Sequence, residues 1–288
     1  MRQAFSRFLR VPFALALAGC SGGLLGATSA PAPAAAPVTY ADVASLADAA
    51  TLIARVEIRD QAQVEPERAP GLEPGNARLY IEADTESLLY GSGALGESVT
   101  YLADVPLGAK GKPPKLKKQR MLLFARAVPG SAARLQLVGP NTQLPASPEL
   151  EARVRAIATE LAAADSPPRV TGIHDALWVP GNLAGESETQ LFLDTKSGAP
   201  VTVSIVRRPG QDPRWGVSWN EIVDQSARAP EKDTLEWYRL ACSLPSRLPA
   251  SAVLSPDPRV RTEAERDYAL VVRDLGPCAR TLSAPIQP

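Results

Sequence analysis

The chain has 288 residues, of which 45% are hydrophobic and 22% are charged, and its 31 basic and 31 acidic residues cancel. This content is enough for a hydrophobic core and excludes a wholly disordered, collagen-like or coiled-coil chain. One histidine and three cysteines are too few for a zinc finger, an iron–sulfur site or a histidine-rich metal site. We therefore expect one or two folded domains and no metal or cofactor.

Residues 1–19 have the composition of an export signal peptide. Three arginines and no acid occupy residues 1–10, and an apolar run follows at residues 11–19. This run is too short to span a bilayer as a helix. Cleavage of the signal peptide is expected after this run. Two cleavage sites are considered, and they differ in whether Cys20 stays in the mature chain.

The four residues Leu17-Ala18-Gly19-Cys20 resemble the lipobox of bacterial lipoproteins. In that family the peptide is cut before the cysteine, which then carries acyl chains such as palmitate. The resemblance implies membrane anchoring through Cys20, and Ser21 at the next position implies the outer membrane, facing the periplasm. The alternative is ordinary cleavage near residues 28–30, which discards Cys20 and leaves a soluble periplasmic or secreted protein.

Residues 20–39 are expected to form a lipidated tether. Alanine, proline, glycine and serine dominate residues 21–38, and no charged residue occurs there. Such a segment cannot bury enough apolar surface to fold, and its prolines favour an extended chain.

A first domain is predicted over residues 40–146. A short helix over 40–50 precedes strands expected over 51–64, 78–90, 98–105, 121–127 and 134–138. Five short strands joined by polar loops are typical of a small, closed or partly open barrel.

The order of these strands resembles the OB-like and TIMP-like barrels of some bacterial lipoproteins. Three segments carry the resemblance: Leu52-Ile53-Ala54-Arg55-Val56, Leu88-Leu89-Tyr90-Gly91 and Met121-Leu122-Leu123-Phe124. The cysteine by which TIMP proteins inhibit their targets is absent from Tyr40 onward, so no inhibitor role is inferred.

A second domain is predicted over residues 147–288. Ser147 and Pro148 begin a helix that extends to residue 164. Strands over 170–179, 189–193, 200–207 and 214–219 follow, and capping boxes predict helices over 234–244 and 263–275. The predicted fold class is α+β: a five-stranded OB-like β-barrel followed by an antiparallel sheet packed with helices.

Two cysteines remain when Cys20 is set aside. Cys242 and Cys278 form an even pair in a chain that carries an export signal. A disulfide between them is the default interpretation for an exported protein.

Residues 105–148 contain eight basic residues and no acid. Six cations fall close together: Lys110, Lys112, Lys115, Lys117, Lys118 and Arg120. One interpretation is a solvated loop whose lysines keep a sheet edge soluble. The other is a contact for anionic lipid headgroups, phosphates or another acidic envelope component. The export signal argues against a nucleic-acid partner.

Motifs that resemble catalytic or cofactor sites have plainer explanations. The glycines of residues 91–96 match G-x-G-x-x-G, but a strand pattern follows them where a dinucleotide site requires a helix. His174 and Asp175 are neighbours on a predicted strand and should point to opposite faces. The four tryptophans all lie in the second half, where core packing explains them better than a sugar-stacking platform.

We assign no catalytic residue from the sequence. The predicted function is that of a lipid-anchored envelope protein that acts as a non-enzymatic binding or scaffold module, with its ligand and protein partner undefined. The alternative is a periplasmic hydrolase acting on an envelope polymer, for which Glu186 with Glu188, or Asp212 with Glu221, are the candidate carboxylate pairs.

Overall fold

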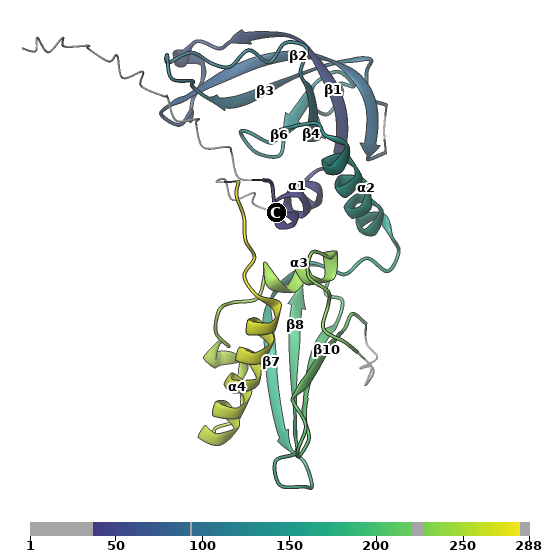
Figure 1. Ribbon diagram of the computed structural model, residues 1–288, viewed down its shortest axis with the longest axis vertical. Helices are drawn as coiled ribbons and strands as arrows, with labels where there is room; N and C mark the ends of the chain where they lie inside the picture. Colours follow the sequence, from purple (N-terminus) through teal and green to yellow (C-terminus); the bar gives the residue numbers. More distant parts are fainter. Residues whose placement is uncertain (1–36, 93, 221–226, 283–288) are drawn as a thin grey trace, which may run out of the picture. The chain divides into compact units, whose positions relative to one another are not determined.

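Two antiparallel sheets and four α-helices make up residues 37–92, 94–220 and 227–282, which this computed structural model describes (Figure 1). The first sheet contains β1 (Leu52–Gln63), β2 (Asn76–Tyr90), β3 (Ser98–Pro106), β4 (Arg120–Ala127), β5 (Leu135–Leu137) and β6 (Gln143–Pro145). The second contains β7 (Val170–Pro180), β8 (Ser187–Thr195), β9 (Val201–Arg207) and β10 (Arg214–Ser218). The helices are α1 (Tyr40–Ala49), α2 (Pro148–Ala162), α3 (Leu235–Ala241) and α4 (Pro258–Leu275). The predicted α+β class is confirmed.

One predicted helix start is wrong by more than a turn, and one strand was not predicted. Helix α4 begins at Pro258, five residues before the predicted start, because Asp257 rather than Thr262 caps it and accepts a hydrogen bond from the Arg259 amide at 2.8 Å. Strand β6 was not expected, since it has only three residues and ends in a proline. The predicted signal peptide, Cys20 and most of the predicted tether lie outside the described residues.

Alternating side chains give the first sheet one buried face. Its strand order is β3-β2-β1-β4-β5, with β6 paired to β4. On β1 and β2 the apolar members of the alternation, such as Val56 and Ile81, are fully buried. The two outer strands of this order meet at one parallel bridge between Thr100 and Arg134, where the Thr100 amide donates to the Ala133 carbonyl at 2.7 Å. No continuous strand pairing closes this sheet within the described residues.

Helix α1 contributes to the cores of both sheets. Its residue Leu46 packs with Ile53 and Phe124 of the first sheet. Ala41, on the same helix, belongs to the cluster that contains Trp237 and the second sheet. The helix begins with a capping box between Thr39 and Asp42, which fixes its first turn.

One face of the second sheet packs against α3 and α4. The sheet order is β10-β9-β8-β7, and side chains such as Val203 and Leu191 are buried against Tyr268 and Val271 of α4. Three of the four tryptophans, Trp178, Trp215 and Trp237, are buried in the same cluster. The interpretation of these tryptophans as core residues is therefore confirmed.

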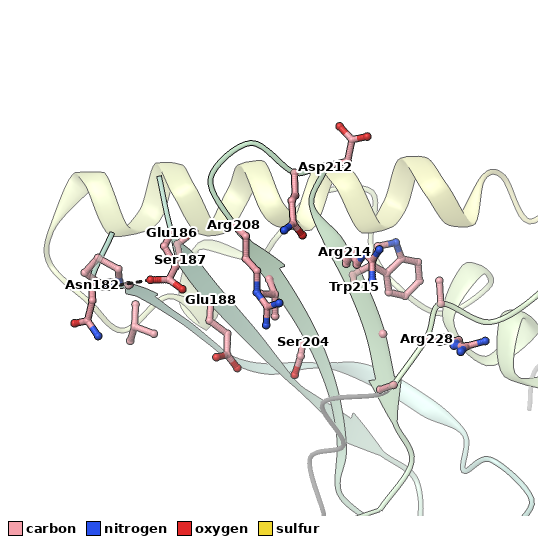
Figure 2. Close-up of a pocket in the computed structure, with 18 residues that line it drawn as sticks. Asn182, Glu186, Ser187, Glu188, Ser204, Arg208, Asp212, Arg214, Trp215 and Arg228 are labelled. Atoms are coloured by element: carbon pink, nitrogen blue, oxygen red, sulfur yellow. Dashed lines mark hydrogen bonds between the residues drawn. The ribbon is translucent and has the colours of Figure 1, made fainter. Parts of the chain in front are cut away.

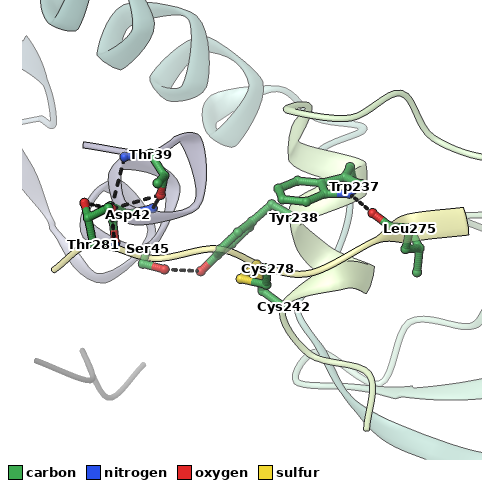
Figure 3. Close-up of a disulfide and its surroundings, with 9 residues drawn as sticks. All are labelled: Thr39, Asp42, Ser45, Trp237, Tyr238, Cys242, Leu275, Cys278 and Thr281. Atoms are coloured by element: carbon green, nitrogen blue, oxygen red, sulfur yellow. Dashed lines mark hydrogen bonds between the residues drawn. A yellow bond between two sulfur atoms is a disulfide. The ribbon is translucent and has the colours of Figure 1, made fainter. Parts of the chain in front are cut away.

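A cystine and a buried carboxylate hold the segment that follows α4 (Figure 3). Cys242 and Cys278 form the predicted disulfide, with their Cα atoms 5.1 Å apart. Farther along, the Thr281 amide and hydroxyl donate to the carboxylate of Asp42 on α1, at 3.0 and 2.8 Å. Asp42 also accepts hydrogen bonds from the Thr39 amide and hydroxyl, and only 2% of the residue is exposed.

Removing the disulfide should lower stability without releasing α4. The cysteines are 36 residues apart, and the chain-entropy model assigns a loop of this length about 3–4 kcal/mol. Because Tyr268, Val271 and Leu275 hold α4 in the core, we expect reduction to free mainly residues 276–282. Melting with and without reductant, with hydrogen exchange, measures both effects. Two free thiols at positions 242 and 278 in the unreduced, denatured chain would refute the disulfide.

The contribution of Asp42 should depend on pH. Burial raises the pKa of Asp42, but hydrogen bonds from Thr281 and Thr39 outweigh burial and hold the pKa below its ordinary value of 3.8. A carboxyl whose pKa is lowered by folding stabilises the protein above its unfolded pKa, and that stability disappears as pH falls through the folded pKa.

We therefore expect Asp42→Asn to cost about 1–3 kcal/mol of unfolding free energy at pH 7, and much less at about pH 2. Urea unfolding at both pH values measures the difference. Asp60→Asn, at an exposed carboxylate, is the matched control and should have a small effect throughout. An equal deficit for Asp42→Asn at both pH values would contradict the proposed ionic role.

Candidate functional site

A cleft of about 890 Å³ lies at one end of the second sheet (Figure 2). Its lining comes from the ends of β7 and β8, from β9, from β10 with the turn before it, and from residues 227–229. Aliphatic side chains of Val179 and Val206 contribute to the lining together with six charged side chains. These are Glu186, Glu188, Arg208, Asp212, Arg214 and Arg228.

The hairpin between β7 and β8 is held in shape by Glu186. Its carboxylate accepts hydrogen bonds from the amides of Asn182 and Leu183 at 3.1 and 3.3 Å, as Figure 2 shows for Asn182. The Gly181 amide donates to the Glu186 carbonyl at 2.8 Å, and a Cβ at Gly181 would lie 2.3 Å from the Glu186 side chain. Glycine at this position therefore lets the glutamate fold back over the turn.

A second glycine, Gly216, leaves space for the segment that carries Arg228. A Cβ at Gly216 on β10 would lie 2.1 Å from the backbone oxygen of Ala227, a distance no real side chain tolerates. The Val217 amide donates to the Arg228 carbonyl at 3.3 Å. Gly216 thus permits residues 227–229 to pass directly against β10.

Two of the three acidic groups of the cleft have hydrogen-bond partners among the described residues, whereas Asp212 and the three arginines have none. Glu186 accepts the two amide hydrogen bonds of the hairpin, and Glu188 accepts one from the Gln190 side chain at 2.8 Å. Arg208, Arg214 and Arg228 make no side-chain hydrogen bond or ion pair with any described residue. The guanidinium groups are therefore charged donors that are available in the cleft, together with the side-chain amides of Asn182 and Gln211.

One hydroxyl among the lining residues is buried. The Oγ of Ser204, on β9, is inaccessible and has no hydrogen-bond partner among the described residues. A buried polar atom without a partner costs free energy, which a bound ligand or water offsets.

The structure brings together three of the four carboxylates singled out in the sequence. Glu186, Glu188 and Asp212 all line the cleft, whereas Glu221 lies outside the described residues. The three arginines were missed by sequence reasoning. Arg208 and Arg214 flank the turn at residues 209–213, and this spacing is the sequence feature that could have indicated that they lie at the same end of the sheet.

His174 lies at the other end of strands β7 and β8. Its ring nitrogens are 3.6 Å from carboxylate oxygens of Asp175 and Asp194, and all three side chains are exposed to solvent. The expectation that His174 and Asp175 point to opposite faces is wrong, because a register shift between Ile173 and Asp175 interrupts the alternation. No cluster suited to a metal ion occurs among the described residues.

The lysines of the basic stretch lie on a well-anchored loop between β3 and β4. Leu116 is buried and fixes the loop. The side-chain amide of Gln61 donates to the Pro114 carbonyl at 2.8 Å and accepts from the Leu116 amide at 2.5 Å. The loop exposes the predicted lysines Lys110, Lys112, Lys115, Lys117 and Lys118. Lys117 is 3.9 Å from the carboxylate of Asp60, which is also exposed.

Arg120 differs from these lysines. It lies on β4 and pairs with Glu86 at 2.8 Å and more loosely with Glu57 at 3.8 Å. Glu86 also pairs with Arg55 at 2.7 Å. Arg120 is therefore part of an ion-pair network on the first sheet.

The glycines of residues 91–96 belong to the connection between β2 and β3, with residue 93 outside the described part. A strand follows them in the chain, as expected, and not a helix. This arrangement lacks the helix that a dinucleotide site requires.

Comparison with protein families and with curated proteins gives no match, since no family model fits the chain and no curated protein matches it significantly. In the part of the chain that the structure describes, no helix has the length and apolar character needed to cross a membrane.

Proposed function

We propose that the chain is an exported, lipid-anchored envelope protein that acts as a non-enzymatic binding module, with the cleft of the second sheet as its ligand site. The observation that carries this proposal is a cleft of about 890 Å³ lined by three arginines whose guanidinium groups have no partner among the described residues. Its volume falls in the range of about 300–1,000 Å³ found for small-molecule sites. The positive head, short apolar run and Cys20 support export and anchoring in the outer membrane, facing the periplasm.

The first sheet is proposed to be an OB-like barrel over residues 40–146, followed by a domain over residues 147–288. Its strand order and the parallel bridge between Thr100 and Arg134 support this form. Closure along β3 and β5 would leave the barrel without free strand edges.

The lysine loop is proposed to contact the anionic surface of the membrane to which the chain is tethered. Its five lysines project from a loop whose backbone is fixed by Gln61 and Leu116. Each lysine near an anionic surface contributes about 1 kcal/mol.

A periplasmic hydrolase is the second candidate function. It is favoured by the presence of Glu186, Glu188 and Asp212 in one cleft. Against it, Glu186 is already engaged by two backbone amides of its own hairpin. A hydrolase would release shortened products from envelope polymer, whereas a binding module would leave its ligand intact.

Changing Cys20 to Ala should move the protein from the membrane to a soluble fraction, or leave the precursor uncut. Acyl chains supply about 0.8 kcal/mol for each buried methylene, so their loss removes the anchor. Membrane fractionation and intact mass measure the change, with Ser21→Ala as the control that should remain anchored. Unchanged mass and fractionation of the Cys20 variant would refute the lipoprotein assignment.

Reversing Lys115, Lys117 and Lys118 to Glu should weaken binding to anionic vesicles by about 100-fold or more, since three favourable contacts of about 1 kcal/mol each are lost. Sedimentation of the Cys20→Ala chain with phosphatidylglycerol vesicles at several salt concentrations measures the effect. Lys196→Glu with Lys232→Glu serves as the control. If both sets of variants bind equally, the loop serves solubility only.

A further inference from the structure

Three exposed apolar residues form one row across the first sheet. Ala62 on β1 is the register partner of Tyr80 on β2, which is in turn the partner of Leu102 on β3. Residues directly opposite each other in an antiparallel pair point to the same face of the sheet. Tyr80 is 43% exposed and Leu102 is 49% exposed, whereas Ile81, on the opposite face of β2, is fully buried. This apolar row therefore places an aromatic and an aliphatic side chain together in solvent.

The lysine loop, residues 107–119, lies beside the apolar row. Gln61, the residue before Ala62 on β1, holds the backbone of the loop through two hydrogen bonds. Asp60 lies two residues before Ala62 and hence on the same face, and its carboxylate is 3.9 Å from the ammonium group of Lys117. The lysine loop and the apolar row thus share one end of the first sheet.

The acidic side chains next to the apolar row are paired with cations. Glu82 and Asp84 follow Tyr80 at alternate positions of β2, and their carboxylates are 3.0 and 3.4 Å from the guanidinium group of Arg59. Of the five lysines in the loop, only Lys117 has an ion-pair partner among the described residues. The loop therefore keeps a positive charge that attracts an anionic surface.

The backbone of Lys118 adopts a conformation that suits glycine better than lysine. Its φ is 68°, and Asp233 is the other non-glycine residue with a positive φ in the described chain. The Lys118 amide donates to the Ile58 carbonyl at 2.7 Å. The Gln119 amide donates to the Leu116 carbonyl at 2.9 Å, which fixes the turn. A lysine in the left-handed region costs free energy, so its presence here favours a role for its side chain.

Basic, aromatic and aliphatic side chains at one end of a sheet match the interface of an anionic bilayer. Lysines are attracted by negative headgroups. A tyrosine ring is apolar at its body and polar at its hydroxyl, so it suits the boundary between headgroups and acyl chains. An exposed leucine adds apolar area that the same boundary buries.

The proposed tether is long enough to bring this end of the sheet to the membrane. The described chain begins at residue 37, directly before α1, and residues 20–36 would span about 50 Å as an extended, proline-rich chain. Strand β1 begins just after α1, and its 12 residues extend over about 40 Å. An anchor at Cys20 and the apolar row near the end of β1 can therefore contact the same bilayer.

We infer that this end of the first sheet docks on an anionic bilayer, with Tyr80 and Leu102 entering the interface while the lysine loop contacts the headgroups. The inference rests on the proposed function, because it adds two inserting residues and an orientation to the membrane contact of the lysine loop. Apolar burial and charge attraction differ in their response to salt, which screens only the attraction between charges.

Vesicle binding separates the two contributions. The chain used is residues 20–288 with Cys20→Ala, the proposed mature chain without its lipid. We expect the combined change Tyr80→Ser and Leu102→Ser to weaken binding to phosphatidylglycerol vesicles about tenfold, because apolar burial is lost, and to leave the salt dependence unchanged. The lysine reversal described above should instead reduce the salt dependence.

The matched control is the combined change Leu177→Ser and Leu254→Ser, at two leucines that are 51% and 76% exposed in the second half of the chain. This variant should bind the vesicles as the unchanged chain does. Circular dichroism checks that each variant is folded.

Insertion is measured directly with an environment-sensitive fluorophore. The disulfide leaves no free thiol in the Cys20→Ala chain, so Leu102→Cys accepts a single nitrobenzoxadiazole label. Its emission should rise and shift to shorter wavelength when phosphatidylglycerol vesicles are added. The same label on Leu177→Cys should show no change.

The inference is overturned if the label at position 102 shows no shift, or the same shift as the label at position 177. A Tyr80 and Leu102 variant that binds as tightly as the control would also overturn it, and would leave a protein as the alternative partner of the apolar row. If the lysine reversal still weakens binding in that case, the contact of the lysine loop stands and only the insertion is refuted.

Discussion

The buried carboxylate of Asp48 is the interaction on which the arrangement of the second half depends. Its side chain is 10% exposed and pairs with Arg169 at 2.7 Å and with Arg239 at 2.8 Å. Arg239 also donates to the Pro167 carbonyl at 3.0 Å. Helix α1, the segment before β7 and helix α3 therefore share one charged cluster. Removing Asp48 would leave the buried guanidinium group of Arg239 without its ion-pair partner, and breaking a buried pair in this way costs about 3–5 kcal/mol.

This cluster explains why α1 is buried along most of its length. Asp48 occupies its last turn, and Asp42 in its first turn receives the C-terminal segment through Thr281. Ser45, between them, hydrogen-bonds to Tyr238 of α3 at 3.0 Å. A ten-residue helix is marginal on its own in water, so tertiary contacts at each end determine that it forms. The disulfide then ties the end of α3 to the segment after α4.

The buried carboxylates of the core have partners, whereas the arginines of the cleft have none among the described residues, and this difference supports a binding role for the cleft. Asp42, Asp48 and Asp267 each accept hydrogen bonds or ion pairs that offset their burial. Arg208, Arg214 and Arg228 are exposed to solvent and make no such contact within the described residues. Exposed cations without a described partner, in the cleft and on the lysine loop, present surfaces suited to anionic groups.

Sequence patterns predicted the strands and the first long helix because local periodicity determines which side chains are buried. The alternation along β1 and the Ser147–Pro148 start of α2 are both local signals, and both appear in the structure. Strand β6 escaped because three residues carry no measurable period. The cleft could not be predicted, since Glu186, Arg208 and Arg228 are brought together only by sheet pairing and by the passage of the chain beside Gly216. The β7–β8 hairpin, the turn at residues 209–213 and the close approach at Gly216 determine the geometry of the cleft, and none of them gives a periodic sequence pattern.

The most direct test of a ligand cleft in this protein is photo-cross-linking in the cells that produce it. A benzophenone amino acid replaces Gln211, an exposed residue that lines the cleft, and Arg266 on α4 is the control position. Mass spectrometry of the purified chain should find an intact small molecule attached at position 211 and absent at position 266. No adduct at position 211, or the same adduct at both positions, would contradict a binding function for the cleft.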